Sequence, residues 1–253
     1  MYILLSPTKT MIQPSVEFKS FENSKPYFKS KAELINSTLR KINKKELQNI
    51  MKLSDNLADE TYNNLHEWGN SNNEKYPAVL TYFGTAFKYL NAQNWSHDTS
   101  VYAQNHLMVL SGLYGLLKPY DLVEKYRLEM GLKFNSLAGF INLYDFWKQD
   151  IINYLTEFKA DKTIINLASN EYIKVFNKYQ YFDKIINCTF LQKSNGKLKS
   201  IANYSKAARG SMANFILKNK IEIPKHLKEF NDFGYSYNND ISENNKLVFI
   251  RDN

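Results

Sequence analysis

Short apolar runs bounded by proline, glycine or polar residues predict a set of buried strands along this chain. The first run ends at Ser6-Pro7, where proline cannot continue a hydrogen-bonded ladder. Two later runs flank Ser194-Asn195-Gly196, a turn sequence that is typical of a hairpin. The predicted strands cover residues 2–5, 77–83, 163–168, 184–191, 197–204 and 246–251.

Apolar positions three and four residues apart predict helices between these strands. In residues 143–158, for example, Trp147, Ile151, Tyr154 and Leu155 share one helical face. The predicted helices cover residues 31–41, 44–53, 55–68, 98–108, 143–158 and 206–219, and another begins at Asn170. We therefore expect one mixed α/β domain over residues 1–253, with a central mixed sheet flanked by helices.

The composition fits a folded protein of a reducing compartment. Of the 253 residues, 43% are hydrophobic and 15% aromatic, which is enough to bury a sizeable core. The apolar runs are far shorter than the roughly 20 residues of a membrane span, and the N-terminus lacks the pattern of a signal peptide. Cys188 is the one cysteine, so no intramolecular disulfide forms. We expect a cytoplasmic monomer without membrane contact, with Cys188 in its core.

Positive charge is concentrated in one stretch of the chain. Residues 159–228 hold 13 lysines and Arg209 against four acidic residues, a net charge of +10, whereas the whole chain carries +8. Such a distribution is typical of a protein with a polyanion partner, and a Lys-rich solvated surface is the alternative. Arginine is rare beside lysine, which draws attention to Arg127 and Arg209, where a planar fork can bind an anion through two hydrogen bonds.

Two candidate anion-binding segments follow predicted strands. Residues 6–10 leave the end of the first strand, where ligands bind in open α/β sheets, so Lys9 and Thr10 can reach an anion. Ser169 is placed to cap the next helix, whose first N–H groups favour negative charge. Each segment has a plainer interpretation: an ordinary polar loop at residues 6–10, and Glu171 itself offsetting the helix dipole.

A glycine pair lies in the apolar stretch 110–116. Gly112 and Gly115, with Ser111 and Tyr114 beside them, suit a tight turn between helices, in which backbone N–H groups approach a phosphate. A helix–hairpin–helix element of DNA-binding proteins uses such a hairpin, although this one has an extra residue between its glycines. A structural turn is the alternative, since a glycine pair alone has low specificity.

Arg127 and Glu129 form a fourth candidate. In an extended chain they share one face, roughly 6.6 Å apart, and beside a pocket they can orient a substrate or transfer a proton. The alternative is a surface ion pair worth less than about 1 kcal/mol.

The helix predicted from Lys206 carries a fifth candidate site. Lys206, Arg209, Gly210 and Ala213 fall on one arc, where two cations beside two small residues let a phosphate lie close to the helix. Glycine in a helix interior costs about 1 kcal/mol relative to alanine, which favours a functional reason for Gly210.

Several kinds of site are missing from the sequence. It has no Gly-Lys-Ser/Thr phosphate loop, no His-Glu-x-x-His and no Gly-x-Ser-x-Gly, and the four histidines show no metal-ligand spacing. We therefore expect no metal site and no cofactor.

Taken in order, these stretches resemble the YaaA family of peroxide-stress proteins. The resemblance rests on Ser-Pro-x-Lys-Thr, Leu-Ser-Gly-Leu-Tyr-Gly-x-Leu, Arg-Leu-Glu-Met-Gly, Asn-Leu-Ala-Ser-x-Glu-Tyr and a Lys-Ala-Arg-Gly-like helix, which are residues 6–10, 110–117, 127–131, 166–172 and 206–210. It implies a role in peroxide stress and low intracellular iron, and DNA binding through a basic cleft with a helix–hairpin–helix element.

The chain departs from the family pattern in one segment. Where relatives often have Phe-Lys-Gly-Asp-Val-Tyr, residues 82–87 read Tyr-Phe-Gly-Thr-Ala-Phe, and Met108 stands where an arginine is frequent. These departures weigh against a chemical role for that segment.

Two classes of function stay open. The first is a protein that binds double-stranded or structured DNA and limits peroxide damage, through Lys206, Arg209 and the glycine hairpin. The second is an enzyme that processes a DNA base or nucleotide in the same cleft, in the manner of a glycosylase or lyase.

In the enzyme interpretation Glu129 or Glu171 serves as acid or base, and an extruded base stacks on Tyr114 or Tyr172. Convergence of Arg127, Glu129 and Glu171 with Lys9 in one pocket would favour the enzyme, and their dispersal would count against it.

Overall fold

The computed structural model describes residues 1–15, 22–137, 139–159, 163–176, 185–194 and 196–252. Its main sheet has the strand order β13-β14-β11-β10-β1-β5-β6, and β12 pairs with β11. The strands of this sheet are β1 (Tyr2–Leu5), β5 (Leu107–Ser111), β6 (Gly115–Leu117), β10 (Ile164–Asn166), β11 (Ile185–Ser194), β12 (Lys197–Lys199), β13 (Tyr235–Tyr237) and β14 (Lys246–Arg251). The expected mixed α/β architecture is confirmed.

Strand β1 lies in the middle of a parallel group. Ile3 pairs with Ile165 of β10 on one side and with Leu107 of β5 on the other, and β10, β11 and β14 continue the parallel run. All four β1 residues are buried, as expected for a parallel strand covered on both faces. The carboxyl ends of β1, β10 and β5 consequently meet at one edge of the sheet.

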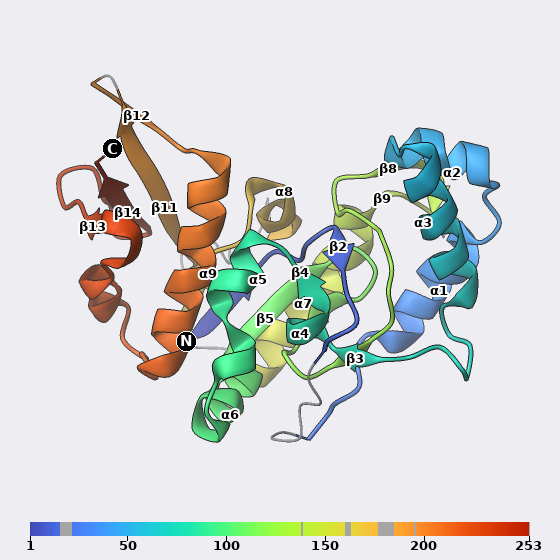
Figure 1. Cartoon of the computed structure of the whole chain (residues 1–253), viewed down its shortest axis with the longest axis horizontal. Helices are drawn as coiled ribbons and strands as arrows, with labels where there is room; N and C mark the ends of the chain where they lie inside the picture. Colours follow the sequence, from blue (N-terminus) through green and yellow to red (C-terminus); the bar gives the residue numbers. More distant parts are fainter. Residues whose placement is uncertain (16–21, 138, 160–162, 177–184, 195, 253) are drawn as a thin grey trace.

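Helices cover both faces of the sheet (Figure 1). Helix α9 lies in front of it together with α5, which packs against α9, and α7 lies behind β5. Helices α1, α2 and α3 gather at the end of the molecule opposite β13 and β14. The α-helices are α1 (Lys29–Leu39), α2 (Lys44–Met51), α3 (Asp55–Glu67), α4 (Ala78–Thr81), α5 (Thr85–Leu90), α6 (His97–His106), α7 (Leu143–Lys159), α8 (Asn170–Ile173) and α9 (Ala202–Lys218).

Shorter elements complete the described chain. Three two-stranded pairings join β2 (Thr10–Met11) with β4 (Tyr82–Phe83), β3 (Tyr76–Pro77) with β7 (Leu122–Val123), and β8 (Lys133–Leu137) with β9 (Phe140–Asn142). The 3₁₀ turns are η1 (Ala92–Asn94), η2 (Lys174–Phe176), η4 (Pro224–Glu229) and η5 (Asp232–Gly234). Within the described ranges, none of the helices has both the length and the apolar character of a membrane span.

The strand predicted over residues 77–83 is wrong for the middle of this range, although Pro77 belongs to β3 and Tyr82 and Phe83 form β4. Pro77 instead precedes a single helical turn, α4, in which the Thr81 hydroxyl donates to the Pro77 carbonyl oxygen over 2.9 Å. Ala78 and Val79 are buried in that turn. A short apolar run has no periodicity that separates a strand from a buried helical turn, and proline at the start favours the turn.

Two predicted boundaries also move. Helix α6 ends at His106, because Leu107 and Met108 pair with β1 as part of β5. The predicted hairpin between β11 and β12 is confirmed, but β12 stops at Lys199 and Tyr204 belongs to α9. Lys184, the predicted first residue of β11, lies outside the described residues.

The glycine pair joins strands rather than helices. Residues 112–114 connect β5 to β6 in an antiparallel hairpin, so the expected helix–hairpin–helix element is wrong for this segment. A Cβ atom at Gly112 would lie 2.4 Å from the Leu128 carbonyl oxygen, and one at Gly115, where φ is +71°, would lie 2.7 Å from the Trp147 ring. Both glycines are therefore required by close packing.

Gly210 has a similar explanation. A Cβ atom at this position would lie 1.9 Å from the carbonyl oxygen of Ala86, the second residue of α5. Ala213, one turn further along α9, is fully buried. The arc of small residues therefore receives α5, and it is not open to a phosphate as the sequence suggested.

We expect Gly210→Ala to lower the free energy of unfolding by about 1–3 kcal/mol, because α5 must shift to admit the new methyl group and overpacking outweighs the gain in helix propensity. Urea unfolding followed by circular dichroism measures the change. Asn203→Ala, at an exposed position of α9, is the matched control and should be neutral or slightly stabilising. Equal stability of the Gly210 variant and wild type would contradict the close contact.

A buried carboxyl group should make stability depend on pH. Burial raises the pKa of Asp121 to about 6, although hydrogen bonds from the Ser24 hydroxyl and the Lys118 N–H act in the opposite direction. Between about pH 4 and pH 6 the unfolded chain releases this proton while the folded chain keeps it, so this group lowers stability as the pH rises, by up to about 3 kcal/mol. Asp121→Asn should remove that part of the pH dependence in urea unfolding at a series of pH values. The exposed Asp240→Asn serves as control, and an unchanged profile in the Asp121 variant would refute the assignment.

Candidate functional site

A cavity of about 340 Å³ opens beyond the carboxyl ends of β1 and β10. It gathers segments that are far apart in the sequence, and residues from most of the predicted chemical motifs line it. The lining is formed by Leu5, Ser6, Pro7, Thr8, Lys9, Thr10, Phe83, Gly84, Thr85, Ala86, Glu129, Leu167, Ser169, Glu171, Tyr172, Lys206 and Arg209.

Two serines join the ends of β1 and β10. The Ser169 N–H donates to the Ser6 hydroxyl oxygen over 2.8 Å, and that hydroxyl donates to the Ser169 hydroxyl over 3.3 Å. Ser169 precedes α8 as predicted, but its side chain makes no capping hydrogen bond to that helix. Its hydroxyl instead holds the loop after β1 in place, so that Lys9 and Thr10 lie on the cavity wall.

Glu129 lies between two cations. Its Oε1 atom pairs with the Lys9 ammonium and lies 3.9 Å from an Nη atom of Arg127. The Glu129 side chain is only 14% exposed, whereas that of Lys9 is 62% exposed. Lys9, Glu129 and Glu171 therefore line one cavity, whereas Arg127 contacts Glu129 without lining that cavity, so the convergence that the enzyme interpretation requires is only partial.

Glu171 links the cavity wall to the segment that carries Arg127. Its Oε1 atom accepts a hydrogen bond from the Gly131 N–H over 3.0 Å, and its carbonyl oxygen accepts one from the Tyr144 hydroxyl over 2.9 Å. A Cβ atom at Gly131 would lie 3.2 Å from the same carboxylate oxygen. One carboxylate oxygen of Glu171 is thus engaged in positioning the backbone.

Helix α9 contributes Lys206 and Arg209. The Nε atom of Arg209 is buried without a hydrogen-bond partner, and the guanidinium makes no ion pair with any residue in the described ranges. Burial lowers the pKa of Arg209, but a guanidinium keeps its proton at neutral pH. A partly buried charge without an ion-pair partner is costly, which favours an anion in the cavity beside it.

The residues of the glycine hairpin are not among those that line this cavity. Ser111, Gly112, Tyr114 and Gly115 are all buried, so none is exposed to a DNA phosphate. The Ser111 and Tyr126 hydroxyl oxygens lie 2.6 Å apart. These residues support the site by packing, rather than by the direct contact expected from the sequence.

Tyr82 and Tyr126 were not among the predicted site residues. Their hydroxyl oxygens lie 2.6 Å apart, and burial raises the pKa of Tyr126 to about 12, so it stays protonated at neutral pH. Tyr114 accepts a hydrogen bond from the Trp68 indole over 2.8 Å, and Tyr172 is 7% exposed. Tyr114 lies outside the cavity lining, whereas Tyr172 is part of that lining although little of its surface is exposed.

Phe83 is the residue that the sequence analysis set aside. It lines the cavity and is 57% exposed, which is high for an aromatic side chain. Residues 82–87 depart from the family pattern, and for that reason the sequence analysis did not predict Phe83 as a site residue. The alternation of Tyr82 and Phe83 in a short strand was the available signal.

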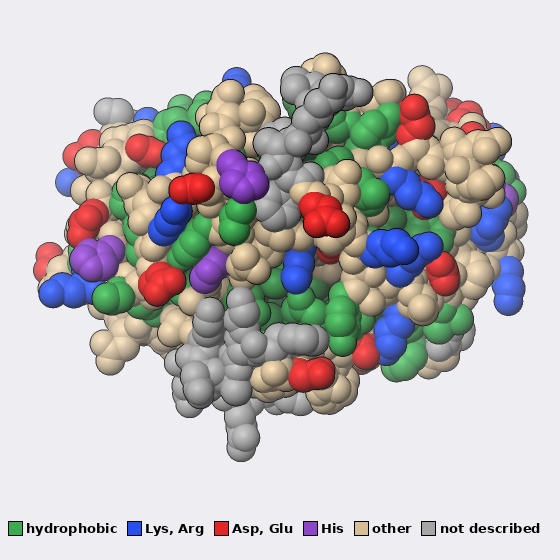
Figure 2. Space-filling view, turned by 90° about the horizontal axis from the view of Figure 1, so that it is seen from below, with side chains coloured by type: hydrophobic (Ala, Val, Ile, Leu, Met, Phe, Trp, Pro, Cys, Tyr) green, Lys and Arg blue, Asp and Glu red, His purple; other side chains and the backbone are tan. Residues whose placement is uncertain are grey.

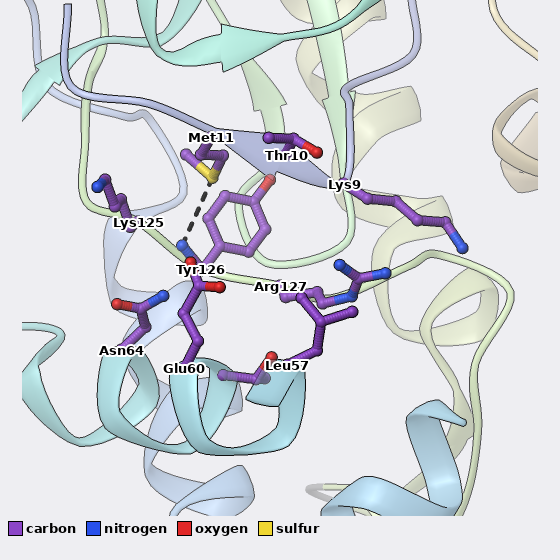
Figure 3. Close-up of a pocket in the computed structure, with 10 residues that line it drawn as sticks. Lys9, Thr10, Met11, Leu57, Glu60, Asn64, Lys125, Tyr126 and Arg127 are labelled. Carbon is purple, nitrogen blue, oxygen red and sulfur yellow. Dashed lines mark hydrogen bonds between the residues drawn. The ribbon is translucent and has the colours of Figure 1, made fainter. Parts of the chain in front are cut away.

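A smaller cavity of about 80 Å³ lies on the other side of Lys9 and Thr10 (Figure 3). Leu57, Glu60 and Asn64 of α3 face the segment that carries Lys125, Tyr126 and Arg127, and the Tyr126 N–H donates to the Met11 sulfur over 3.5 Å. The Nε atom of Arg127 is buried without a hydrogen-bond partner. Arg127 lines this smaller cavity and not the larger one, with which it is connected only through its contact with Glu129.

Among the described residues, neither a reactive thiol nor a cluster of potential metal ligands accompanies the site. Cys188 is buried, and burial raises the pKa of its thiol to about 12, which leaves little reactive thiolate. Across the described ranges, no three His, Cys, Asp or Glu side chains gather into a potential metal site. On the face shown in Figure 2, lysine and arginine side chains are interspersed with acidic ones and do not form a single basic patch.

Comparison with known proteins agrees with the resemblance seen in the motifs. The family model described as peroxide stress protein YaaA matches residues 1–241. A UPF0246 protein of Legionella pneumophila (strain Corby) is 38% identical over 257 residues, covering 99% of each chain. One of Clostridium perfringens (strain SM101) is 38% identical over the full length of both chains, and one of Desulfotalea psychrophila is 35% identical over 98% of this chain and 97% of its own. The chain belongs to the YaaA family of peroxide stress proteins.

Proposed function

We propose that this protein is a cytoplasmic monomer that binds double-stranded or structured DNA through the cavity beyond β1 and β10, and so limits oxidative damage during peroxide stress. The observation that carries the proposal is the unpaired guanidinium of Arg209 beside Lys206 on the cavity wall. A phosphate group is the anion that suits a planar guanidinium fork and an adjacent ammonium.

The distribution of charge supports the same assignment. Lys206 is exposed and Arg209 is half-buried. An incoming phosphate therefore meets the solvated ammonium of Lys206 first, and then the less solvated guanidinium of Arg209 on the cavity wall. Glu129 is already paired with Lys9, which reduces the repulsion that it exerts on an incoming phosphate. The excess of +10 over residues 159–228 adds long-range attraction for a polyanion.

Neutralising the two α9 cations should weaken DNA binding. For Lys206→Gln/Arg209→Gln we expect at least about a tenfold loss of affinity at 50 mM salt and a decrease of about 2 in the slope of log K against log salt concentration, because fewer counterions are released. Fluorescence anisotropy with a labelled duplex and a labelled junction measures both quantities.

The matched control is Lys197→Gln/Lys199→Gln, which removes two exposed lysines of β12 outside the cavity lining. Equal losses in the two double variants would assign binding to the general basic surface and contradict the role of the cavity. Wild-type binding that does not change between 50 and 300 mM salt would contradict phosphate recognition altogether.

A second candidate, an enzyme that processes a base or nucleotide, gains support from the convergence of Glu129, Glu171 and Lys9 around one cavity. Glu129, paired with the flexible and exposed Lys9, can exchange that contact for a substrate group. Its carboxylate is then in a position to act as acid or base, while Lys206 and Arg209 hold the phosphate.

Incubation with damaged and undamaged DNA, scored for base release and strand cleavage, tests this candidate. We expect product from wild type and a rate lower by about 10²–10⁴-fold for Glu129→Gln, because general acid–base catalysis contributes that much. Asp240→Asn is the matched neutral control at an exposed position. If DNA is retained but no substrate yields product, the enzyme candidate fails and the binding function stands.

A further inference from the structure

Phe83 stands between two cavities of different character. On one side is the cationic cavity with Lys206 and Arg209. On the other is a cavity of about 360 Å³ with a largely apolar lining, formed by Ile12, Pro14, Ser15, Val79, Leu80, Tyr82, Phe83, Phe87, Lys88, Ala92 and Gln93. The exposed ring of Phe83 is therefore a wall that both cavities share.

The pairing of β4 with β2 orients the Phe83 ring toward solvent. Phe83 pairs with Thr10, and Tyr82 with Met11, in the short antiparallel ladder of β2 and β4. The Ile12 N–H donates to the Thr81 carbonyl oxygen over 2.9 Å and extends the contact. Because side chains alternate along a strand, the buried Tyr82, which is 3% exposed, requires Phe83 to face solvent.

An exposed aromatic wall beside unpaired cations matches a ligand with both a planar apolar part and a phosphate. A nucleotide has both, since its base has a π face that stacks on aromatic rings and its phosphate pairs with lysine and arginine. Inorganic phosphate would leave Phe83 and the apolar cavity unused, and an apolar ligand would leave Arg209 unpaired. A base inside a duplex has no free face to offer, because its neighbours are stacked on both faces.

We propose that Phe83 stacks on an unpaired base of the nucleotide whose phosphate lies against Lys206 and Arg209. The inference rests on the proposed DNA-binding function and narrows its ligand to single-stranded or extruded nucleotides. The base lies at the boundary of the apolar cavity, and the phosphate lies in the cationic one.

The test compares two labelled oligonucleotides of twelve nucleotides: oligo-dT, and a strand of the same length and phosphate number whose residues lack bases. Wild type should bind oligo-dT about fivefold to a hundredfold more tightly, the range that corresponds to stacking of one base. Phe83→Ala should abolish this preference, and Phe83→Tyr should preserve it. Phe140→Ala removes a second exposed phenylalanine, on β9, and should leave the preference unchanged.

A second experiment distinguishes a free nucleotide from a nucleotide within a DNA strand. In a Phe83→Trp variant, titration with thymidine 5′-monophosphate should quench fluorescence, and deoxyribose 5-phosphate should not, if a free nucleotide is bound in this way. Phe140→Trp controls for collisional quenching. Quenching by oligo-dT alone would restrict the ligand to a strand and would still support stacking.

The outcomes separate the two proposals. If Lys206→Gln/Arg209→Gln weakens both oligonucleotides while Phe83→Ala keeps the preference for bases, the stacking inference is overturned and phosphate binding stands. If neither oligonucleotide nor duplex DNA binds wild type, the proposed function is overturned, and the inference with it. Loss of the preference in Phe83→Ala, with unchanged binding of the strand without bases, supports both.

Discussion

The parallel pairing of β1 between β10 and β5 is the constraint on which the site depends. It places the loop after Leu5 beside the loop after Asn166, although the two are separated by some 160 residues of chain. The Ser6–Ser169 contact is possible only in this register, and it sets the course of the chain through Lys9 to the short pairing of β2 with β4. A shift of one residue would turn the buried side chains of β1 to the opposite faces and disperse the site.

The charges at this edge are satisfied unequally. Glu129 has Lys9 and Arg127 as neighbours, and Glu171 has the Gly131 N–H. Arg209 has no counter-ion among the described residues. A fold that satisfies its carboxylates and leaves one guanidinium open keeps the local field positive, and this asymmetry, rather than the total charge of the chain, points to an anionic ligand.

The sequence predicted the parts of the site that depend on local rules. Lys9, Ser169 and Glu171 were found because ligands gather beyond strand ends, and those ends are visible as apolar runs that stop at polar residues. The spacing of Arg127 and Glu129 was informative because an extended chain puts alternate residues on one face. The glycines were interpreted as phosphate-binding positions, because a sequence does not show which backbone lies close to a glycine. In the structure the Leu128 backbone lies against Gly112, and the Ala86 backbone lies against Gly210. Phe83 was missed because its segment departs from the family pattern, although alternation with the buried Tyr82 places its side chain on the exposed face of β4.

The close approach of α5 and α9 at Gly210 has a consequence for recognition. Gly84 separates Phe83 from α5, and Arg209 precedes Gly210 on α9, so the aromatic ring and the guanidinium are attached to the two helices that touch at this point. With backbone packed on backbone, neither helix can slide along the other to adjust the spacing between ring and charge. In the proposed complex, this fixed spacing would favour a nucleotide whose base and phosphate match it, because little freedom is lost on binding, and would reject a ligand of another length by geometry rather than by repulsion.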